Sequence, residues 1–147
     1  MPDPADPEDR LGYAVALLRG AAAVAASAHR EGKRFVHPFF LLICFALENG
    51  LKAYLQFRGV DNNEKIDRPP LAHDLNRLLG LAVAIGLVLP DSSIKLIDSL
   101  SDSHLNHQFR YPKNGGTVEL FSDAFAYTWT DETLASIARA IGYRPAN

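Results

Sequence analysis

Side chains able to transfer protons or bind phosphate gather in three short stretches of this 147-residue chain. In the first stretch, Glu48 and Lys52 are four residues apart, so on a helix they share one face and can pair. The other two stretches hold His73, Asp74 and Arg77, and then His104, His107, Arg110 and Tyr111. Imidazole, guanidinium and ammonium groups can hold a phosphate, and a histidine can also act as a general acid or base.

Each stretch also has a purely structural explanation, which the sequence leaves open. Glu48 and Lys52 can form an ion pair that does no more than stabilise their helix. Asp74 can cap a helix, because a carboxylate is stabilising next to a helix start. Arg110 can serve the exposed carbonyl groups at a helix end.

Metal and thiol chemistry have weaker support. His104 and His107 lie three residues apart and can share a metal ion, but no carboxylate with ligand spacing accompanies them on that helix. We therefore expect no metal and no cofactor. The only cysteine, Cys44, lies in the apolar run 39–47, which raises a thiol pKa and argues against a catalytic Cys–His pair. The chain has no phosphate-binding loop, dinucleotide-binding turn or nucleophile elbow.

The composition is that of one globular domain, with 48% hydrophobic and 22% charged residues. A formal net charge of −2 provides no global basic field, so phosphate binding requires a local cluster of cations. The acidic, proline-rich start does not resemble a secretory signal, and the run 39–47 is too short to span a bilayer. We expect a disordered tail over residues 1–6, a single domain over 7–147, a cytoplasmic location and no membrane contact.

Hydrophobic periodicity and cap signals predict an all-α fold, an up-and-down bundle of four to five helices. The expected helices run from Pro7 to about Gly32, from about Pro38 to Gly59, from Leu71 to Ile85, from Pro90 to Pro112, and from a cap at Thr130 to Gly142. Residues 114–130 are rich in aromatic and β-branched side chains, which leaves a short hairpin and an irregular segment equally open.

The bundle determines where the three polar stretches lie. If the first four helices alternate in direction, the end of the second, the start of the third and the end of the fourth meet at one end of the bundle. The polar stretches are then expected to line one groove there.

Three motifs in this order resemble the HEPN family of small helical proteins. Glu48 to Ala53 resembles its E-x-x-L-K-A helix, and Ala72 to Leu75 resembles its G-H-D-L start, with alanine in place of glycine. Phe109 to Pro112 resembles its RYP signature. The resemblance covers roughly residues 35–113 and implies a bundle of four or five helices that often forms a symmetric dimer.

The resemblance also implies two kinds of activity. The family includes RNases of toxin–antitoxin and other defence systems, and non-catalytic members that bind RNA or nucleotides. Its RNases carry an arginine four to six residues before a histidine, and they cleave without metal across a dimer. In this chain His104 and His107 precede Arg110, which reverses that order.

Three hypotheses follow. The preferred one is a non-catalytic module that binds RNA, a nucleotide or a partner through Glu48, Lys52, His73, Asp74, Arg77 and Tyr111. The second is a metal-independent endoribonuclease, with His104 or His107 as acid and base and Arg110 holding the phosphate. The third is a structural scaffold subunit. The expected partners are a second copy of the chain and an antitoxin or nucleotidyltransferase-like protein.

Overall fold

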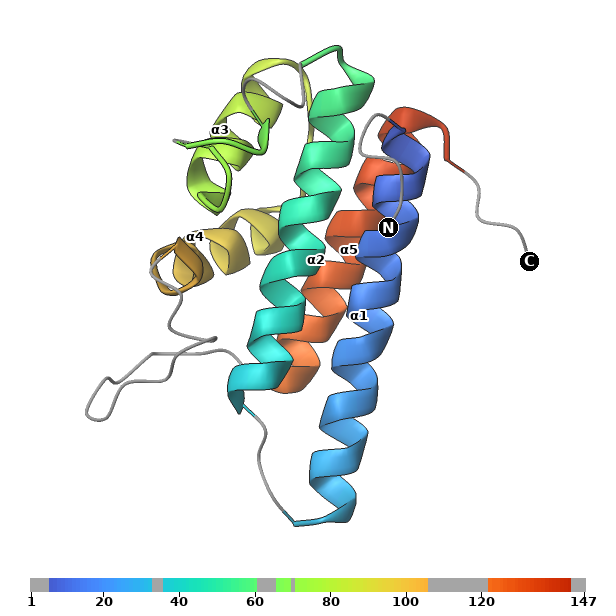
Figure 1. The fold of residues 1–147 in the computed structure, drawn as a ribbon, viewed down its shortest axis with the longest axis vertical. Coiled ribbons are helices and arrows are strands. Elements are labelled where there is room, and N and C mark those ends of the chain that lie inside the picture. The colour runs from blue at the N-terminus through green and yellow to red at the C-terminus, as the bar shows by residue number, and fades with distance from the viewer. Residues whose placement is uncertain (1–5, 33–35, 61–65, 70, 106–121, 144–147) are drawn as a thin grey trace.

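Helices account for the architecture of the chain in the computed structural model, which describes residues 6–32, 36–60, 66–69, 71–105 and 122–143 (Figure 1). The five helices are α1 (Pro7–Arg30), α2 (Val36–Phe57), α3 (Leu75–Ala84), α4 (Asp91–Leu105) and α5 (Asp123–Ile141). No strand occurs among these described residues. The predicted all-α helical bundle is therefore confirmed.

The start of α1 and the end of α5 carry the capping residues that the sequence predicted. The Asp6 carboxylate accepts hydrogen bonds from the backbone N–H groups of Glu8 at 2.9 Å and Asp9 at 3.4 Å. Pro7 occupies the first helical position, where its missing N–H is not needed. Gly142 ends α5 in the left-handed conformation, with φ of 73°.

The third helix begins later than predicted, at Leu75 instead of Leu71. The Asp74 carboxylate accepts a hydrogen bond from the backbone N–H of Arg77 at 3.1 Å and caps the helix there. Before the cap, the Asp74 N–H bonds to the Leu71 carbonyl in a turn. His73 therefore lies in the turn that leads into α3, not within the helix.

The last helix begins earlier than predicted, at Asp123 instead of after a cap at Thr130. Ser122 is the cap, and its Oγ accepts a hydrogen bond from the backbone N–H of Phe125 at 3.3 Å. The Thr130 hydroxyl donates to the Ala126 carbonyl at 2.7 Å, as buried threonines do inside helices. The rest of the undecided segment, and the predicted end of the fourth helix, lie outside the described residues.

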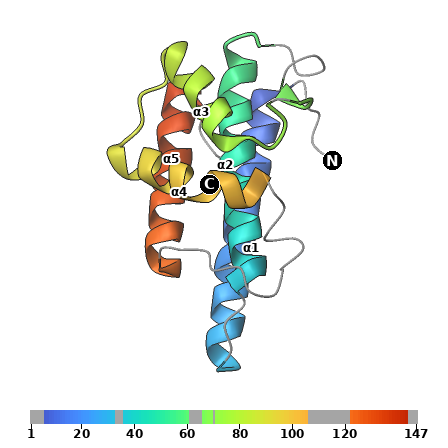
Figure 2. The same cartoon turned by 90° about the vertical axis from the view of Figure 1, so that its left-hand side faces the viewer.

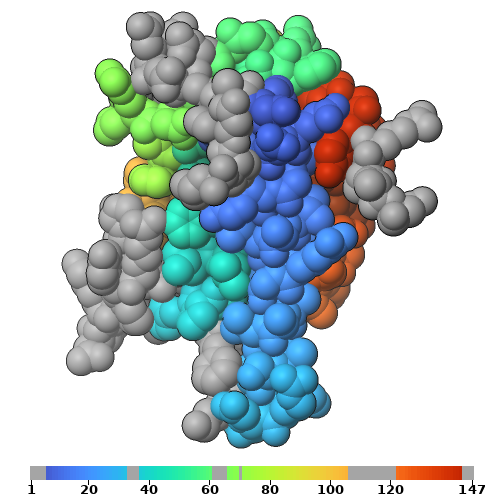
Figure 3. All heavy atoms as spheres, turned by 45° about the vertical axis from the view of Figure 1, so that its right-hand side comes forward, coloured from blue at the N-terminus to red at the C-terminus, as the bar shows by residue number. Residues whose placement is uncertain are grey.

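The central helix is α2, which contacts each of the other four helices. The three long helices α1, α2 and α5 pack side by side, and α3 and α4 cover the opposite side of α2 (Figures 1 and 2). In Figures 1 and 2, α4 runs crosswise to α2. The last turns of α1 extend beyond the other helices (Figures 1 and 3). A helix that is apolar nearly all round requires such a covered position. Fully buried α2 side chains include Phe40, Ile43, Leu47, Leu51 and Leu55.

Close packing between α2 and α5 depends on a glycine. A Cβ placed on Gly50 would lie 2.5 Å from Leu134 Cδ2 and 3.3 Å from Ile137 Cδ1. Because real Cβ atoms essentially never approach another atom as closely as 2.5 Å, an alanine at this position would force the Leu134 side chain to shift within the core.

Two helical spans, Pro7–Arg30 and His37–Phe57, are long and apolar enough to cross a membrane by length and composition. The sequence prediction considered only the shorter run 39–47 within the second span. An 18-residue window of the second span is 72% buried inside the protein, as in an ordinary core helix, and that of the first is 28% buried. Length and composition are weak grounds for a membrane span, because core helices meet the same criteria.

Candidate functional site

A buried carboxylate, Glu48, lies near the middle of α2 and collects three hydrogen bonds. Its Oε1 is 2.9 Å from His73 Nδ1 and 2.8 Å from His104 Nε2, and its Oε2 accepts from Lys52 Nζ at 3.1 Å. The Glu48 side chain is 5% exposed, and a charge so deeply buried requires partners of this kind. An ionised carboxylate only accepts hydrogen bonds, so each of these ring nitrogens carries a proton.

The network continues from Lys52 to the N-terminal helix. Lys52 Nζ also donates to Asp67 Oδ1 at 2.9 Å. The Arg10 guanidinium, from α1, donates two hydrogen bonds to Asp67, one to Oδ1 at 3.4 Å and one to Oδ2 at 3.1 Å. Arg10 and Asp67 were not predicted as site residues. The resulting chain of alternating charges joins α1, the segment before α3, and α2.

Both carboxylates are held in their ionised form. Burial alone would raise the pKa of Glu48, but hydrogen bonds from His104 and His73 and the charge of Lys52 outweigh it and lower the pKa to about 2. Burial also opposes ionisation of Asp67, but hydrogen bonds from Arg10 and Lys52 hold its pKa below the usual value. Two carboxylates and two cations therefore balance within the network.

Aromatic contacts orient the two imidazole rings. Phe45 meets the His104 ring edge-on, with centroids 5.2 Å apart, and meets the His73 ring at 6.4 Å. The two imidazole centroids lie 5.9 Å apart, also with perpendicular planes. These ring contacts help to hold both imidazoles with one nitrogen directed at the same carboxylate oxygen.

Of the predicted residues, the structure brings four together: Glu48, Lys52, His73 and His104. They meet beside the middle of α2, not at one end of the bundle as the alternating arrangement predicted. The structural reason is that α4 crosses α2, so the last turn of α4 reaches the flank of α2 (Figure 2).

The remaining predicted residues fall into two groups. Asp74 and Arg77 lie in the first turn of α3, where Arg77 Nε is 3.2 Å from Asp74 Oδ2 and the Arg77 side chain is 62% exposed. His107, Arg110 and Tyr111 lie outside the described residues, as does the RYP-like motif.

The predicted thiol behaviour agrees with the structure. Cys44 is fully buried in α2, and burial and the negative charge of Glu48 raise the pKa of its thiol well above the usual value. A thiol that stays protonated is a poor nucleophile, so Cys44 acts as a small apolar core residue.

Three ligand-type atoms of this site are close enough to share one ion. The carboxylate of Glu48 and one ring nitrogen each of His73 and His104 all lie within 4.8 Å of one another. The sequence analysis expected these three residues to line one groove but did not predict them as a metal-ligand set, because they come from three separate elements and share no ligand spacing.

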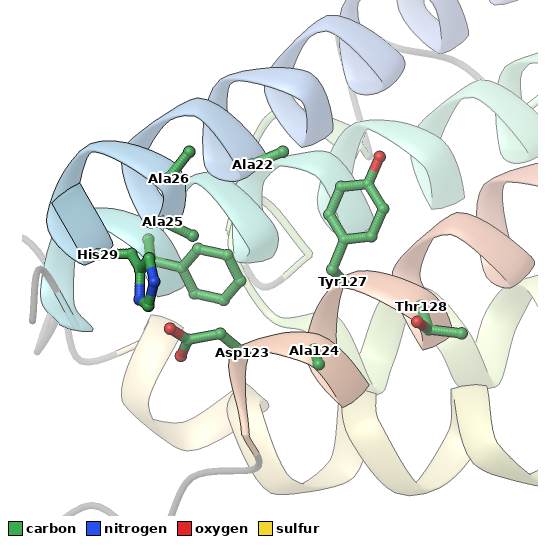
Figure 4. Close-up of a pocket in the computed structure, with 9 residues that line it drawn as sticks. Ala22, Ala25, Ala26, His29, Asp123, Ala124, Tyr127 and Thr128 are labelled. Atoms are coloured by element: carbon green, nitrogen blue, oxygen red, sulfur yellow. The ribbon is translucent and has the colours of Figure 1, made fainter.

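A separate pocket of about 500 Å³ lies between the end of α1, the start of α2 and the start of α5 (Figure 4). Its wall is mainly apolar, and His29 and Asp123 lie at one end of it (Figure 4). Asp123 Oδ1 is buried and has no hydrogen-bond partner among the described residues. None of the predicted site residues lines this pocket. Its lining residues are Ala22, Ala25, Ala26, His29, Phe39, Asp123, Ala124, Tyr127 and Thr128.

Comparison with known proteins adds no assignment to this geometry. Any proposal about the family of this chain rests on the resemblance of its three motifs. No protein-family model matches the chain, no curated protein matches its sequence, and no solved structure matches its fold.

Proposed function

We propose that this chain is a HEPN-like binding module of the cytoplasm that recognises a phosphate group of RNA or a nucleotide. One observation carries the proposal. Glu48 and Lys52 from one motif and His73 from the next meet in a single buried network, as residues of one site would. Ionisable groups with strongly shifted pKa values are found at functional sites more often than elsewhere, and Glu48 is such a group.

The proposed ligand-binding groups are exposed side chains of the segment that carries His73 and of the first turn of α3. Lys52 and Arg10 are buried and already paired with carboxylates, so they position other residues and do not meet the ligand. The side chains of His73 and Arg77 are 38% and 62% exposed, and Arg68 is exposed in the same segment. Histidine and arginine N–H groups bind phosphate oxygens through charge-assisted hydrogen bonds.

Binding fits the site better than catalysis does. A general acid or base has to reach the proton that it transfers, and the His104 side chain is 4% exposed and bonded to Glu48. The metal-independent RNase hypothesis therefore depends on His107 and Arg110, which lie outside the described residues.

The proposal includes a homodimer, in a toxin–antitoxin or defence setting, with an antitoxin or nucleotidyltransferase-like partner. The outer face of α1 supports a dimer, because the helix has a mean hydropathy of 1.5 over a window that is only 28% buried. Light scattering tests it: we expect twice the chain mass of 16.1 kDa, and the mass of a single chain would contradict it.

Fluorescence anisotropy with a labelled single-stranded RNA, in EDTA and with ATP as competitor, tests the proposed ligand. We expect Arg77→Ala to weaken binding and to lower the salt slope by about one, as expected for one lost phosphate contact. Arg139→Ala is the matched control, because Arg139 is also exposed but lies on α5.

Three outcomes separate the hypotheses. A folded wild-type protein that binds neither RNA nor ATP would contradict the proposal and favour a scaffold. Equal losses in Arg77→Ala and Arg139→Ala would place the ligand elsewhere. RNA cleavage in EDTA that His104→Ala/His107→Ala abolishes would establish the RNase instead.

A further inference from the structure

The convergence of His73 and His104 on one oxygen of Glu48 allows chemistry beyond phosphate binding. The three residues come from the turn before α3, the last turn of α4 and the middle of α2. We infer that Glu48, His73 and His104 form a binding site for a divalent transition-metal ion of the zinc class. Two imidazoles and one carboxylate are a common ligand set for zinc sites that keep one position open.

Two of the three distances between ligand atoms require only a small adjustment, and the third, between the two ring nitrogens, is within 4.8 Å. An ion about 2.0–2.2 Å from each ligand atom holds those atoms about 3.2–3.5 Å apart in tetrahedral geometry. The two nitrogen–oxygen distances are now 2.9 and 2.8 Å, so each has to open by roughly half an ångström. Rotation of the half-exposed His73 ring can supply part of this opening.

Surrounding contacts hold the ligands as outer partners do in metal sites. Lys52 binds the second carboxylate oxygen, which fixes the Glu48 plane and leaves Oε1 for the ion. Phe45 packs edge-on against the buried His104 ring, with centroids 5.2 Å apart, and limits its rotation, and it lies farther from the His73 ring, at 6.4 Å. Because these contacts already hold the ligand side chains in place, the side chains lose less conformational freedom when the ion binds.

The fourth position lies on the open side of the site. The side chains of Glu48 and His104 are 5% and 4% exposed, whereas that of His73 is 38% exposed, so an ion meets solvent beside His73. Water or an anion can therefore complete the coordination there.

Charge and ligand type determine which ion fits. The charges of Glu48, Asp67, Lys52 and Arg10 cancel, so a dication brings two uncompensated charges. An anionic fourth ligand offsets part of that excess. Each neutral imidazole has to carry its proton on the other ring nitrogen when the nitrogen that faces Glu48 binds the metal. Imidazole ligands favour Zn²⁺, Co²⁺, Ni²⁺ or Cu²⁺ over Mg²⁺ and Ca²⁺.

Titration of the metal-free full chain with Co²⁺ tests the inference, because visible absorption bands report Co²⁺ coordination directly. We expect one Co²⁺ per chain, displacement by Zn²⁺, and no effect of Mg²⁺. His73→Ala is expected to lose the bands, and His29→Ala, which alters an exposed histidine at the end of α1, is expected to keep them. Circular dichroism verifies that each variant is folded.

A second readout needs no variant. Zn²⁺ is expected to shift the imidazole NMR signals of His73 and His104 and to leave those of His29 unchanged. Absence of Co²⁺ bands in folded wild type, bands that persist in His73→Ala, or shifts confined to other histidines would each overturn the inference. RNA binding in EDTA is measured separately, so failure of the metal site leaves the proposed function standing.

Discussion

At the scale of single residues, Lys52 compensates the buried carboxylate of Glu48 and also binds the carboxylate of Asp67, which is 40% exposed. It donates to both Glu48 and Asp67, and its side chain is 4% exposed. Replacing it would leave Glu48 with its histidine partners and Asp67 with Arg10, and no cation between them. Removing one partner of a buried pair is strongly destabilising because the other charge loses its compensation.

We therefore predict that Lys52→Met lowers the free energy of unfolding by about 3–5 kcal/mol. Urea denaturation followed by circular dichroism measures the change. Lys95→Met is the matched control, because Lys95 is exposed on α4, and we expect a change within about 0.5 kcal/mol there. Equal effects of the two substitutions would show that the network contributes no stability.

Asp67 is expected to make the stability of the folded protein depend on pH in the acidic range. Arg10 and Lys52 face this carboxyl and lower its pKa from the usual 3.8. A lowered folded-state pKa contributes stability that is present above the unfolded value and is lost as the pH falls through the folded value. We predict that wild type loses stability below about pH 3.8 more steeply than Asp67→Asn, measured by urea midpoints across that range. Parallel pH profiles would exclude an ionised Asp67 in the network.

The site was only partly predictable from the sequence. Glu48, Lys52, His73 and His104 were found because ionisable residues stand out within apolar helices. Arg10 and Asp67 were missed because they are 57 residues apart and only the packing of α1 against the segment before α3 joins them. Spacing along one helix carries no information about such a contact.

At the scale of elements, local cap signals predicted some helix ends correctly and others not. Asp6 and Pro7 start α1, and Gly142 stops α5, as predicted. Asp74 proved to be the cap of α3, which the sequence had allowed as one reading of that residue. The start of α5 was wrong, because β-branched and aromatic side chains between residues 122 and 130 favour strands locally, while packing against α1 and α2 stabilises a helix.

The α2–α5 contact yields a prediction of its own. We predict that Gly50→Ala destabilises the protein by about 1–3 kcal/mol, because the new methyl group overlaps Leu134. Gly80→Ala is the opposite control: its Cβ would meet nothing within 4 Å in the middle of α3, and we expect stabilisation of about 0.5–1 kcal/mol. Thermal unfolding compares the two. A neutral Gly50→Ala would mean that the Leu134 and Ile137 side chains shift to admit the methyl group and would contradict the predicted overlap.

At the scale of the whole molecule, the crossing of α4 over α2 creates the site. The sequence predicted an all-α bundle, and its hydrophobic periodicity identified each of the five helices. Periodicity does not encode the angle between helices, so the sequence placed the polar stretches at one end of the bundle. The crossing instead brings His104 to the flank of α2, beside the turn that carries His73. A ligand on this flank would contact the half-exposed His73 and leave the distant end of α1 unchanged.

Imidazole NMR signals of the wild-type chain, recorded in EDTA during titration with a short single-stranded RNA, test this account most directly. We predict that the His73 signals shift in a saturable manner with the RNA, while those of His29, at the far end of α1, do not move. Saturable shifts at His29 with His73 unchanged, or no shift at any histidine, would contradict a phosphate-binding site on the α2 flank.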